Sequence, residues 1–176
     1  MKVPAISILI SEAEIRERVT QLATEIAASM PADFLIVALL RGSFVFAADL
    51  IRALHRVGAS PQVDFLTVSS YGKGTESTGT LTVHRDISED VSGRAILLID
   101  DILESGFTLF HAREELRRRG AKDIHIAVLL EKPGKRKIEI NADYVGFTIP
   151  DKFVVGYGLD QANYYRELPF IGVVEG

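Results

Sequence analysis

The sequence predicts an α/β fold with a mostly parallel, doubly wound sheet, and three observations support that class. Runs of branched apolar residues without alternation are typical of strands buried on both faces of a parallel sheet. Such runs are Phe34 to Leu40, Ala95 to Ile99 and Ile124 to Leu130. Helical patterns separate them, as in doubly wound folds. The length of 176 residues, with 47% hydrophobic and 25% charged residues, suits one globular domain covering residues 1–176.

Three helices are expected. The first opens with the capping box Ser11-Glu12-Ala13-Glu14 and ends before Pro31. Its apolar stripe includes Ile15, Val19, Leu22 and Ile26. The second runs from Phe44 to Val57, with Gly58 as its C-cap, and the third presents Leu109, Ala112 and Leu116 on one side before Gly120.

Further strands are expected at Gln62 to Ser69 and Leu81 to Arg85. The stretch from Asp143 to Val174 is strand-like and interrupted by glycines. It predicts a small β-rich hood subdomain over the edge of the sheet, contributed mainly by about residues 131–176.

Composition excludes several classes of protein. There is no cysteine, so neither a disulfide nor a thiolate metal site is available. The net charge of −4 gives no general attraction to nucleic acid. No apolar run approaches the roughly 20 residues that a membrane span needs. We therefore expect a cytoplasmic protein with neither a nucleic-acid partner nor a membrane partner.

The stretch from Ala95 to Leu109 predicts the functional site. Asp100 and Asp101 follow a buried strand, at the edge where open α/β sheets bind ligands. Residues 104–108 then offer hydroxyls, a glycine and free backbone N–H groups, which suit an anion. Carboxylates beside an anion need another partner. Sugar hydroxyls, a divalent metal or a developing cation would each provide one, and a phosphorylated sugar with Mg²⁺ would provide all three. The alternative is that these acids only cap the helix.

Two polar stretches leave their roles open. Residues 70–79 are rich in glycine and small polar residues, which fits either a solvated hairpin loop or a lid that closes over a ligand. The cationic turn from Glu131 to Lys137 follows a strand at the edge that holds Asp100 and Asp101. Its charges could be solvated or could meet phosphates.

An apolar strand, an acidic pair, two apolar residues, an acid and then Ser-Gly-x-Thr resembles the phosphoribosyl diphosphate (PRPP) motif of type I phosphoribosyltransferases. The tail narrows the resemblance, because residues 143–147 and 149–160 are similar to those of the 6-oxopurine salvage enzymes, the hypoxanthine (hypoxanthine-guanine) phosphoribosyltransferases. Ser69-Ser70-Tyr71-Gly72 and Leu40-Arg41-Gly42-Ser43-Phe44 match the lid and diphosphate loop of that family.

The resemblance implies purine salvage, in which the 5-phosphoribosyl group of PRPP moves to N9 of hypoxanthine or guanine, giving IMP or GMP and diphosphate. Mg²⁺ is the implied cofactor and a homo-oligomer, dimer or tetramer, the implied assembly. By resemblance, Asp100 and Asp101 hold the ribose, and Asp160, Asp100 and Asp101 lie at the metal. Diphosphate contacts fall to Arg41, Gly42 and Arg166, and the 5′-phosphate contacts to Glu104, Ser105, Gly106, Phe107 and Thr108. Purine contacts fall to Lys132, Lys152, Phe153 and Val154, and the lid to Ser70 and Tyr71.

Two positions depart from the family pattern. Glu104 stands where many members have Asp, the residue assigned to the purine N7 proton as general base; the extra methylene changes its reach. Arg41 stands where lysine is usual. The order of preference among hypoxanthine, guanine and xanthine is left open.

The main rival from another class is a regulator that binds PRPP without turnover, although no DNA-binding helix pair is evident in the sequence. A flavodoxin-like receiver is a third reading, but it leaves the Ser-Gly-Phe-Thr segment at residues 105–108 unexplained.

Overall fold

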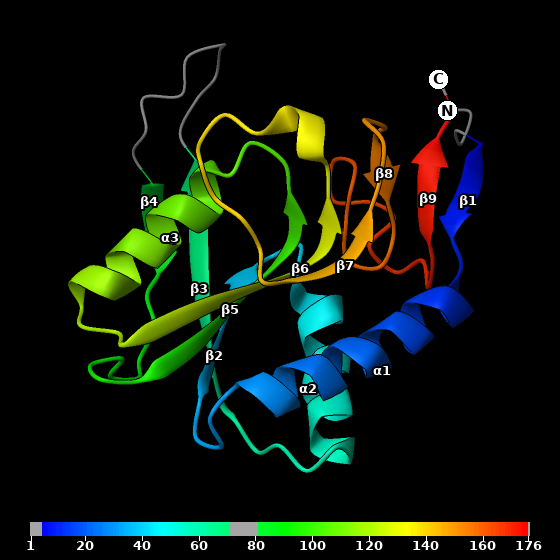
Figure 1. The fold of residues 1–176 in the computed structure, drawn as a ribbon. Coiled ribbons are helices and arrows are strands. Elements are labelled where there is room, and N and C mark those ends of the chain that lie inside the picture. The colour runs from blue at the N-terminus through cyan, green and yellow to red at the C-terminus, as the bar shows by residue number, and fades with distance from the viewer. Residues whose placement is uncertain (1–4, 71–80, 176) are drawn as a thin grey trace.

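The computed structural model describes residues 5–70 and 81–175, which form two sheets and three α-helices (Figure 1). The elements in chain order are β1 (Ile6–Ile10), α1 (Glu12–Ser29), β2 (Leu35–Leu40), α2 (Phe44–Arg56), β3 (Gln62–Ser70), β4 (Leu81–Arg85), β5 (Ala95–Leu103), α3 (Phe107–Arg118), β6 (Asp123–Glu131), the 3₁₀ turn η1 (Pro133–Lys135), β7 (Tyr144–Thr148), β8 (Val154–Val155) and β9 (Ile171–Val174).

The larger sheet has the strand order β4-β3-β2-β5-β6-β7, and every neighbouring pair is parallel except β3 with β4. Helices α1 and α2 cover one face and α3 covers the other (Figure 1). Successive side chains of β5 point to opposite faces of the sheet. Leu97 and Ile99 pack with α1 and α2, while Ile96 and Leu98 pack with α3. The predicted doubly wound α/β class is confirmed.

Helix α1 begins as its sequence predicts. The Ser11 backbone N–H donates to Glu14 Oε2 at 2.8 Å, and the Glu14 backbone N–H donates to Ser11 Oγ at 3.3 Å, which completes a capping box. The predicted stripe Ile15, Val19, Leu22 and Ile26 is buried. This stripe packs α1 against α2 and the sheet.

The small antiparallel sheet has the order β1-β9-β8 and corresponds to the hood expected from the sequence. The strands of this sheet differ in two places from those expected for the hood. Strand β1, from the N-terminal end, pairs with β9, a partner about 160 residues away that no local pattern indicates. Strand β7 joins the larger sheet by pairing parallel to β6. Arg18 of α1 donates to the carbonyls of Val145 and Gly146 at 2.8 and 3.0 Å and so occupies the free edge of β7.

Strand β5 is longer than the run Ala95 to Ile99 predicts. It pairs with β2 only as far as Ala38 opposite Ile99, whereas its pairing with β6 continues to Leu103 opposite Glu131. Strands β2 and β5 therefore separate beyond Ile99. The chain leaves β2 toward β3 on one side and leaves β5 toward β6 on the other, so this separation is the topological switch point of the sheet.

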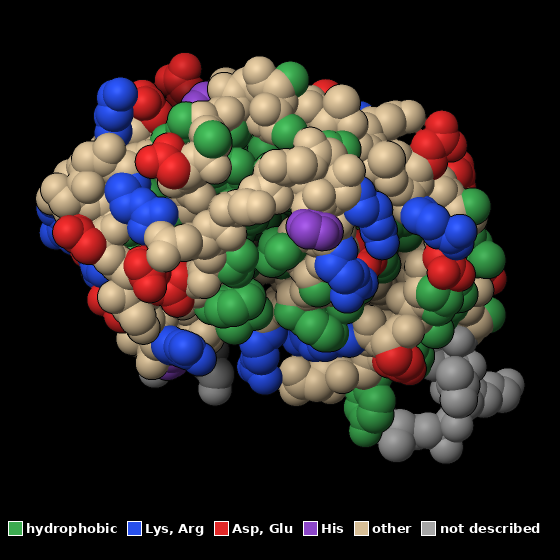
Figure 2. Space-filling view, turned by 90° about the horizontal axis from the view of Figure 1, so that it is seen from below, with side chains coloured by type: hydrophobic (Ala, Val, Ile, Leu, Met, Phe, Trp, Pro, Cys, Tyr) green, Lys and Arg blue, Asp and Glu red, His purple; other side chains and the backbone are tan. Residues whose placement is uncertain are grey.

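The surface seen in Figure 2 carries acidic and basic side chains interspersed, without a broad area of one sign on that face. Within residues 5–70 and 81–175, no helix is long and apolar enough to cross a membrane.

Candidate active site

A cavity of about 280 Å³ opens where β2 and β5 separate. Its lining comes from the end of β2 and the loop after it, from the end of β5, and from the first turn of α3. These residues are 39–42, Val68, 100–106, Thr108 and Leu109. Most of the residues predicted for the ribose and the 5′-phosphate therefore lie around one cavity.

Asp100 and Asp101 stand side by side in this cavity. Each carboxylate accepts a hydrogen bond from the backbone N–H of the next residue. Asp100 Oδ1 accepts from the Asp101 N–H at 2.9 Å, and Asp101 Oδ1 accepts from the Ile102 N–H at 2.8 Å. Burial and then the neighbouring Asp101 charge raise the pKa of Asp100 well above its usual value. Burial also raises the pKa of Asp101, although hydrogen bonds and the Arg166 charge oppose it. Both carboxyl groups therefore release their protons less readily than isolated aspartates do.

Gly42 faces this pair from the loop after β2. A Cβ on Gly42 would collide with Asp101 Oδ2, so only glycine allows the loop to approach the carboxylate this closely. The Leu40–Arg41 peptide bond in this loop is cis. Arg41 is exposed at the mouth of the cavity.

Residues 104–108, which are predicted to bind the 5′-phosphate and are called the phosphate cradle below, lie at the start of α3. Gly106 is the N-cap residue with φ of 87°, and its carbonyl accepts from the Phe110 N–H at 2.9 Å. The first-turn N–H groups after Gly106 have no carbonyl four residues earlier within the helix, and such groups suit an anion. Thr108 lines the cavity with Ser105. Phe107 does not line it; its ring stacks on His111 at 6.4 Å, which leaves its backbone as its contribution.

The cationic turn from Glu131 to Lys137 contacts the backbone that leads into the phosphate cradle. Arg136 Nη1 donates to the carbonyls of Leu103 and Glu104 at 3.1 and 2.8 Å, and its Nη2 donates to Glu131 Oε1 at 2.6 Å. Sequence reasoning did not single out Arg136, which lies in the cationic turn that could have met phosphates. Its role here is to fix the backbone on which Glu104 stands.

Glu104 Oε1 accepts from Lys132 Nζ, and Lys132 is only 6% exposed. Lys132 Nζ lies 4.0 Å from Asp151 Oδ1, and Asp151 Oδ2 lies 2.6 Å from Lys135 Nζ. The cationic turn thus forms ion pairs within the protein. Glu104, the predicted general base, and Lys132, one of the predicted purine contacts, are therefore direct partners. The sequence alone does not predict this contact, because the two residues follow different strands.

The predicted purine segment follows Asp151. Phe153 is 55% exposed, and Lys152 is exposed beside it. An exposed aromatic ring of this size can stack on a flat ligand. Val154 is buried in β8 and pairs with Val173 of β9. The contact between Asp151 and Lys132 brings this segment to the end of β6.

Arg166 and Asp160 form an ion pair at 2.8 Å. Arg166 Nη1 also donates to the Gly158 carbonyl at 2.5 Å, and a Cβ on Gly158 would collide with the Gly42 carbonyl. The two predicted diphosphate segments therefore touch. Of the predicted lid residues, Ser70 ends β3, and Tyr71 lies outside the described residues.

A model of the phosphoribosyl transferase domain family matches residues 10–162 of this chain. The chain therefore belongs to the phosphoribosyltransferase family.

Its relatives within this family include hypoxanthine and hypoxanthine-guanine phosphoribosyltransferases. The chain is 44% identical over 172 residues to the hypoxanthine enzyme of Escherichia coli K12, with 96% of this chain and 95% of the relative covered. It is 46% identical over 169 residues to the hypoxanthine-guanine enzyme of Bacillus subtilis 168, with 96% and 92% covered. A crystal structure of the Staphylococcus aureus hypoxanthine enzyme matches with a TM-score of 0.91 and 39% identity, covering 96% of this chain and 91% of that chain.

The raised pKa of Asp100 predicts a pH-dependent stability. The folded chain keeps a proton that the unfolded chain releases above about pH 4, so stability falls as pH rises from there toward the raised pKa. Asp100→Asn should remove this fall and melt at a higher temperature than the wild type at pH 7, with the difference shrinking toward pH 4. Thermal unfolding across pH measures both.

Asp86→Asn is the control of opposite sign. Hydrogen bonds from Arg119, at 2.8 and 2.9 Å, lower the pKa of Asp86. That variant should lose stability at pH 7 and match the wild type in acid. An Asp100→Asn curve parallel to the wild-type curve would contradict the raised pKa of Asp100.

Gly42→Ala should weaken PRPP binding by at least about tenfold, because the new methyl group displaces the Asp101 carboxylate. A displacement of a functional side chain by about 1 Å has effects of this size or larger. Gly134→Ala is the matched control, since a Cβ there meets no atom within 4 Å. Calorimetric titration with PRPP and Mg²⁺ compares the two variants, and equal affinities would show that the close approach of Gly42 to Asp101 has no functional role.

Proposed function

We propose that this protein is a Mg²⁺-dependent purine salvage enzyme that transfers the 5-phosphoribosyl group of PRPP to N9 of hypoxanthine, guanine or both, releasing diphosphate. The observation that supports this most strongly is the single crevice at the switch point. There an acidic pair, a helix N-terminus and a glycine loop surround a space of about 280 Å³.

The roles follow from the chemistry of each group. Asp100 and Asp101 accept hydrogen bonds from the ribose 2′- and 3′-hydroxyls, which are donors suited to carboxylates. The backbone N–H groups and hydroxyls of residues 104–108 bind the 5′-phosphate. Arg41, the Gly42 amide and Arg166 bind the diphosphate as it leaves.

The purine loses one ring proton when N9 bonds to the anomeric carbon and the bond to diphosphate breaks. Glu104 would accept that proton at N7, and Lys132 would contact the oxygen at position 6. Both side chains already meet at the edge of the crevice, where Lys132 donates to Glu104. Phe153 would stack on the base, with Lys152 and the Val154 backbone beside it.

The donor set fits Mg²⁺. Asp100 and Asp101 offer hard oxygen ligands, and within the described part of the chain neither forms an ion pair with a basic side chain. No group of three possible protein ligands gathers among the described residues, so the ion would complete its shell with substrate oxygens and water, as Mg²⁺ commonly does. Asp160 would take part after release from Arg166. The bound ion would neutralise charge on the departing diphosphate.

The proposal includes location and assembly. PRPP is a multiply charged metabolite held inside the cell, so the enzyme would act in the cytoplasm. The family resemblance favours a homo-oligomer, either a dimer or a tetramer.

Diphosphate release with PRPP, Mg²⁺ and each purine in turn tests the reaction. We expect release with hypoxanthine or guanine, little with adenine, and none once EDTA removes the metal. PRPP binding without turnover with any base would identify a PRPP-sensing regulator instead.

Glu104→Gln should lower kcat by about 10²-fold or more with little change in PRPP affinity, because a carboxamide cannot accept the proton. Glu104→Asp is the control that keeps the carboxylate and should retain most of the turnover. Steady-state kinetics at saturating PRPP measure both. Equal turnover in the Gln variant and the wild type would exclude Glu104 as the base.

A further inference from the structure

The proposed diphosphate site is assembled from two chain segments more than 100 residues apart. One is the Arg41–Gly42 loop, which leads directly into α2. The other is the loop that holds Asp160 and Arg166. The chemistry needs both at a fixed separation, because their donors act on the same leaving group. One contact that helps to hold this separation lies outside the site itself.

The second loop begins with three successive residues at positive φ: Gly156 at 97°, Tyr157 at 50° and Gly158 at 99°. Such a backbone is unusual for tyrosine. Its N–H groups tie it to the far side of the loop, because Tyr157 N–H donates to the Leu168 carbonyl at 2.8 Å and Gly158 N–H to the Arg166 carbonyl at 3.0 Å. This loop is therefore one tightly bonded unit, and Arg166 moves with Tyr157.

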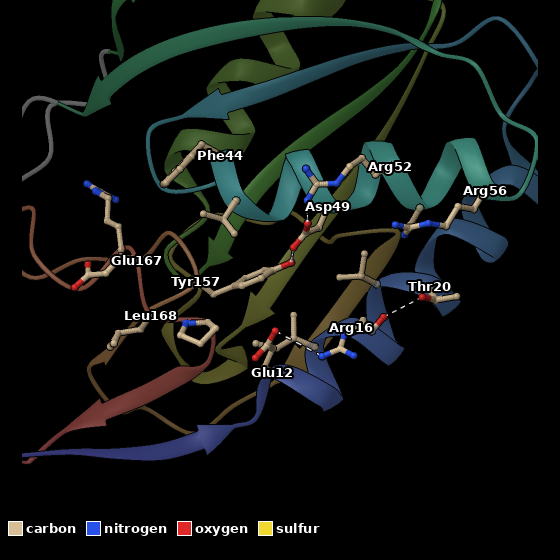
Figure 3. A pocket seen from close by; sticks show the side chains of 16 residues that line it. Glu12, Arg16, Thr20, Phe44, Asp49, Arg52, Arg56, Tyr157, Glu167 and Leu168 are labelled. Atoms are coloured by element: carbon tan, nitrogen blue, oxygen red, sulfur yellow. Dashed lines mark hydrogen bonds and ion pairs between the residues drawn. The ribbon is translucent and has the colours of Figure 1, made fainter.

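The Tyr157 side chain reaches from this loop to α2. Its ring is 6% exposed, and its hydroxyl donates to Asp49 Oδ2 at 2.5 Å (Figure 3). The pair lines a cavity of about 670 Å³ between α1, α2 and the loop. Asp49 also accepts from Arg52, one turn further along α2. Arg52 bonds to Oδ1 of Asp49, and the Tyr157 hydroxyl bonds to Oδ2.

The phenol is a dependable donor in this position. Burial, and then the hydrogen bond to Asp49, raise the pKa of Tyr157. The hydroxyl therefore keeps its proton at any pH where the protein functions. A hydrogen bond to a charged acceptor is also stronger than one between neutral groups.

We propose that Asp49 and Tyr157 are positioning residues for the diphosphate site, their hydrogen bond fixing the loop of Asp160 and Arg166 to the helix that begins with the Arg41–Gly42 loop. The inference rests on the proposed function. Asp49 lies less than two turns into α2, and Tyr157 directly precedes Gly158, whose carbonyl accepts from Arg166. Backbone packing of Gly158 on Gly42 limits the approach of the loops, and the hydrogen bond resists their separation.

Steady-state kinetics of Tyr157→Phe and Asp49→Ala test the proposal. Both variants should raise the KM for PRPP, and the KM for diphosphate in the reverse reaction, by about 3- to 10-fold, the range expected from one lost hydrogen bond. The KM for hypoxanthine should stay unchanged. Asp49→Asn keeps an oxygen that accepts from the phenol and should recover most of the wild-type KM.

Tyr144→Phe is the matched control. It removes a tyrosine hydroxyl that bonds to Ser29 Oγ at 2.6 Å, in a residue that is 9% exposed and on β7 rather than in the site. Its melting temperature should fall about as far as that of Tyr157→Phe, with unchanged KM values. Wild-type turnover combined with identical KM profiles for Tyr157→Phe and Tyr144→Phe would overturn the positioning role. Absence of turnover in the wild type would overturn the proposed function and this inference with it.

Discussion

The site depends on one constraint, the early end of pairing between β2 and β5. Their ladder stops at Ala38 and Ile99, while β5 stays paired with β6 to Leu103. The two central strands can separate only at the switch point, where the chain runs in opposite directions to either side. Asp100 and Asp101 occupy the gap, and Gly42 faces them from the loop after β2. All further contacts in the crevice are arranged around this gap.

The charges around the crevice divide into two groups. Glu104 forms an ion pair with Lys132, and Asp160 forms one with Arg166, so a basic side chain compensates the charge of each of these acids. Asp100 and Asp101 have no ion pair with a basic side chain among the described residues, and burial raises the pKa of both. A half-buried carboxylate without a basic partner is unfavourable unless a ligand compensates its charge. This arrangement supports the proposed role of the acidic pair in binding sugar hydroxyls and a metal ion.

Much of this arrangement follows from the sequence because its signals are local. Apolar runs indicated the central strands, the capping box indicated α1, and the acidic pair after a strand indicated the crevice. Strand β1 was missed because its partner β9 is distant in sequence, and β7 was misassigned to the hood because short strands look alike in either sheet. The contacts of Arg136 with Glu104 and of Tyr157 with Asp49 were out of reach for the same reason. They join segments whose spacing only the folded chain defines.

The proposed function requires PRPP to bind in the crevice where β2 and β5 separate, between the Arg41–Gly42 loop and the first turn of α3. Amide hydrogen exchange, followed by mass spectrometry with and without PRPP and Mg²⁺, locates the ligand without relying on turnover. We expect slower exchange in residues 41–43 and 104–109, with peptides from the middle of α1 unchanged. Unchanged exchange in both crevice segments at saturating PRPP would contradict it.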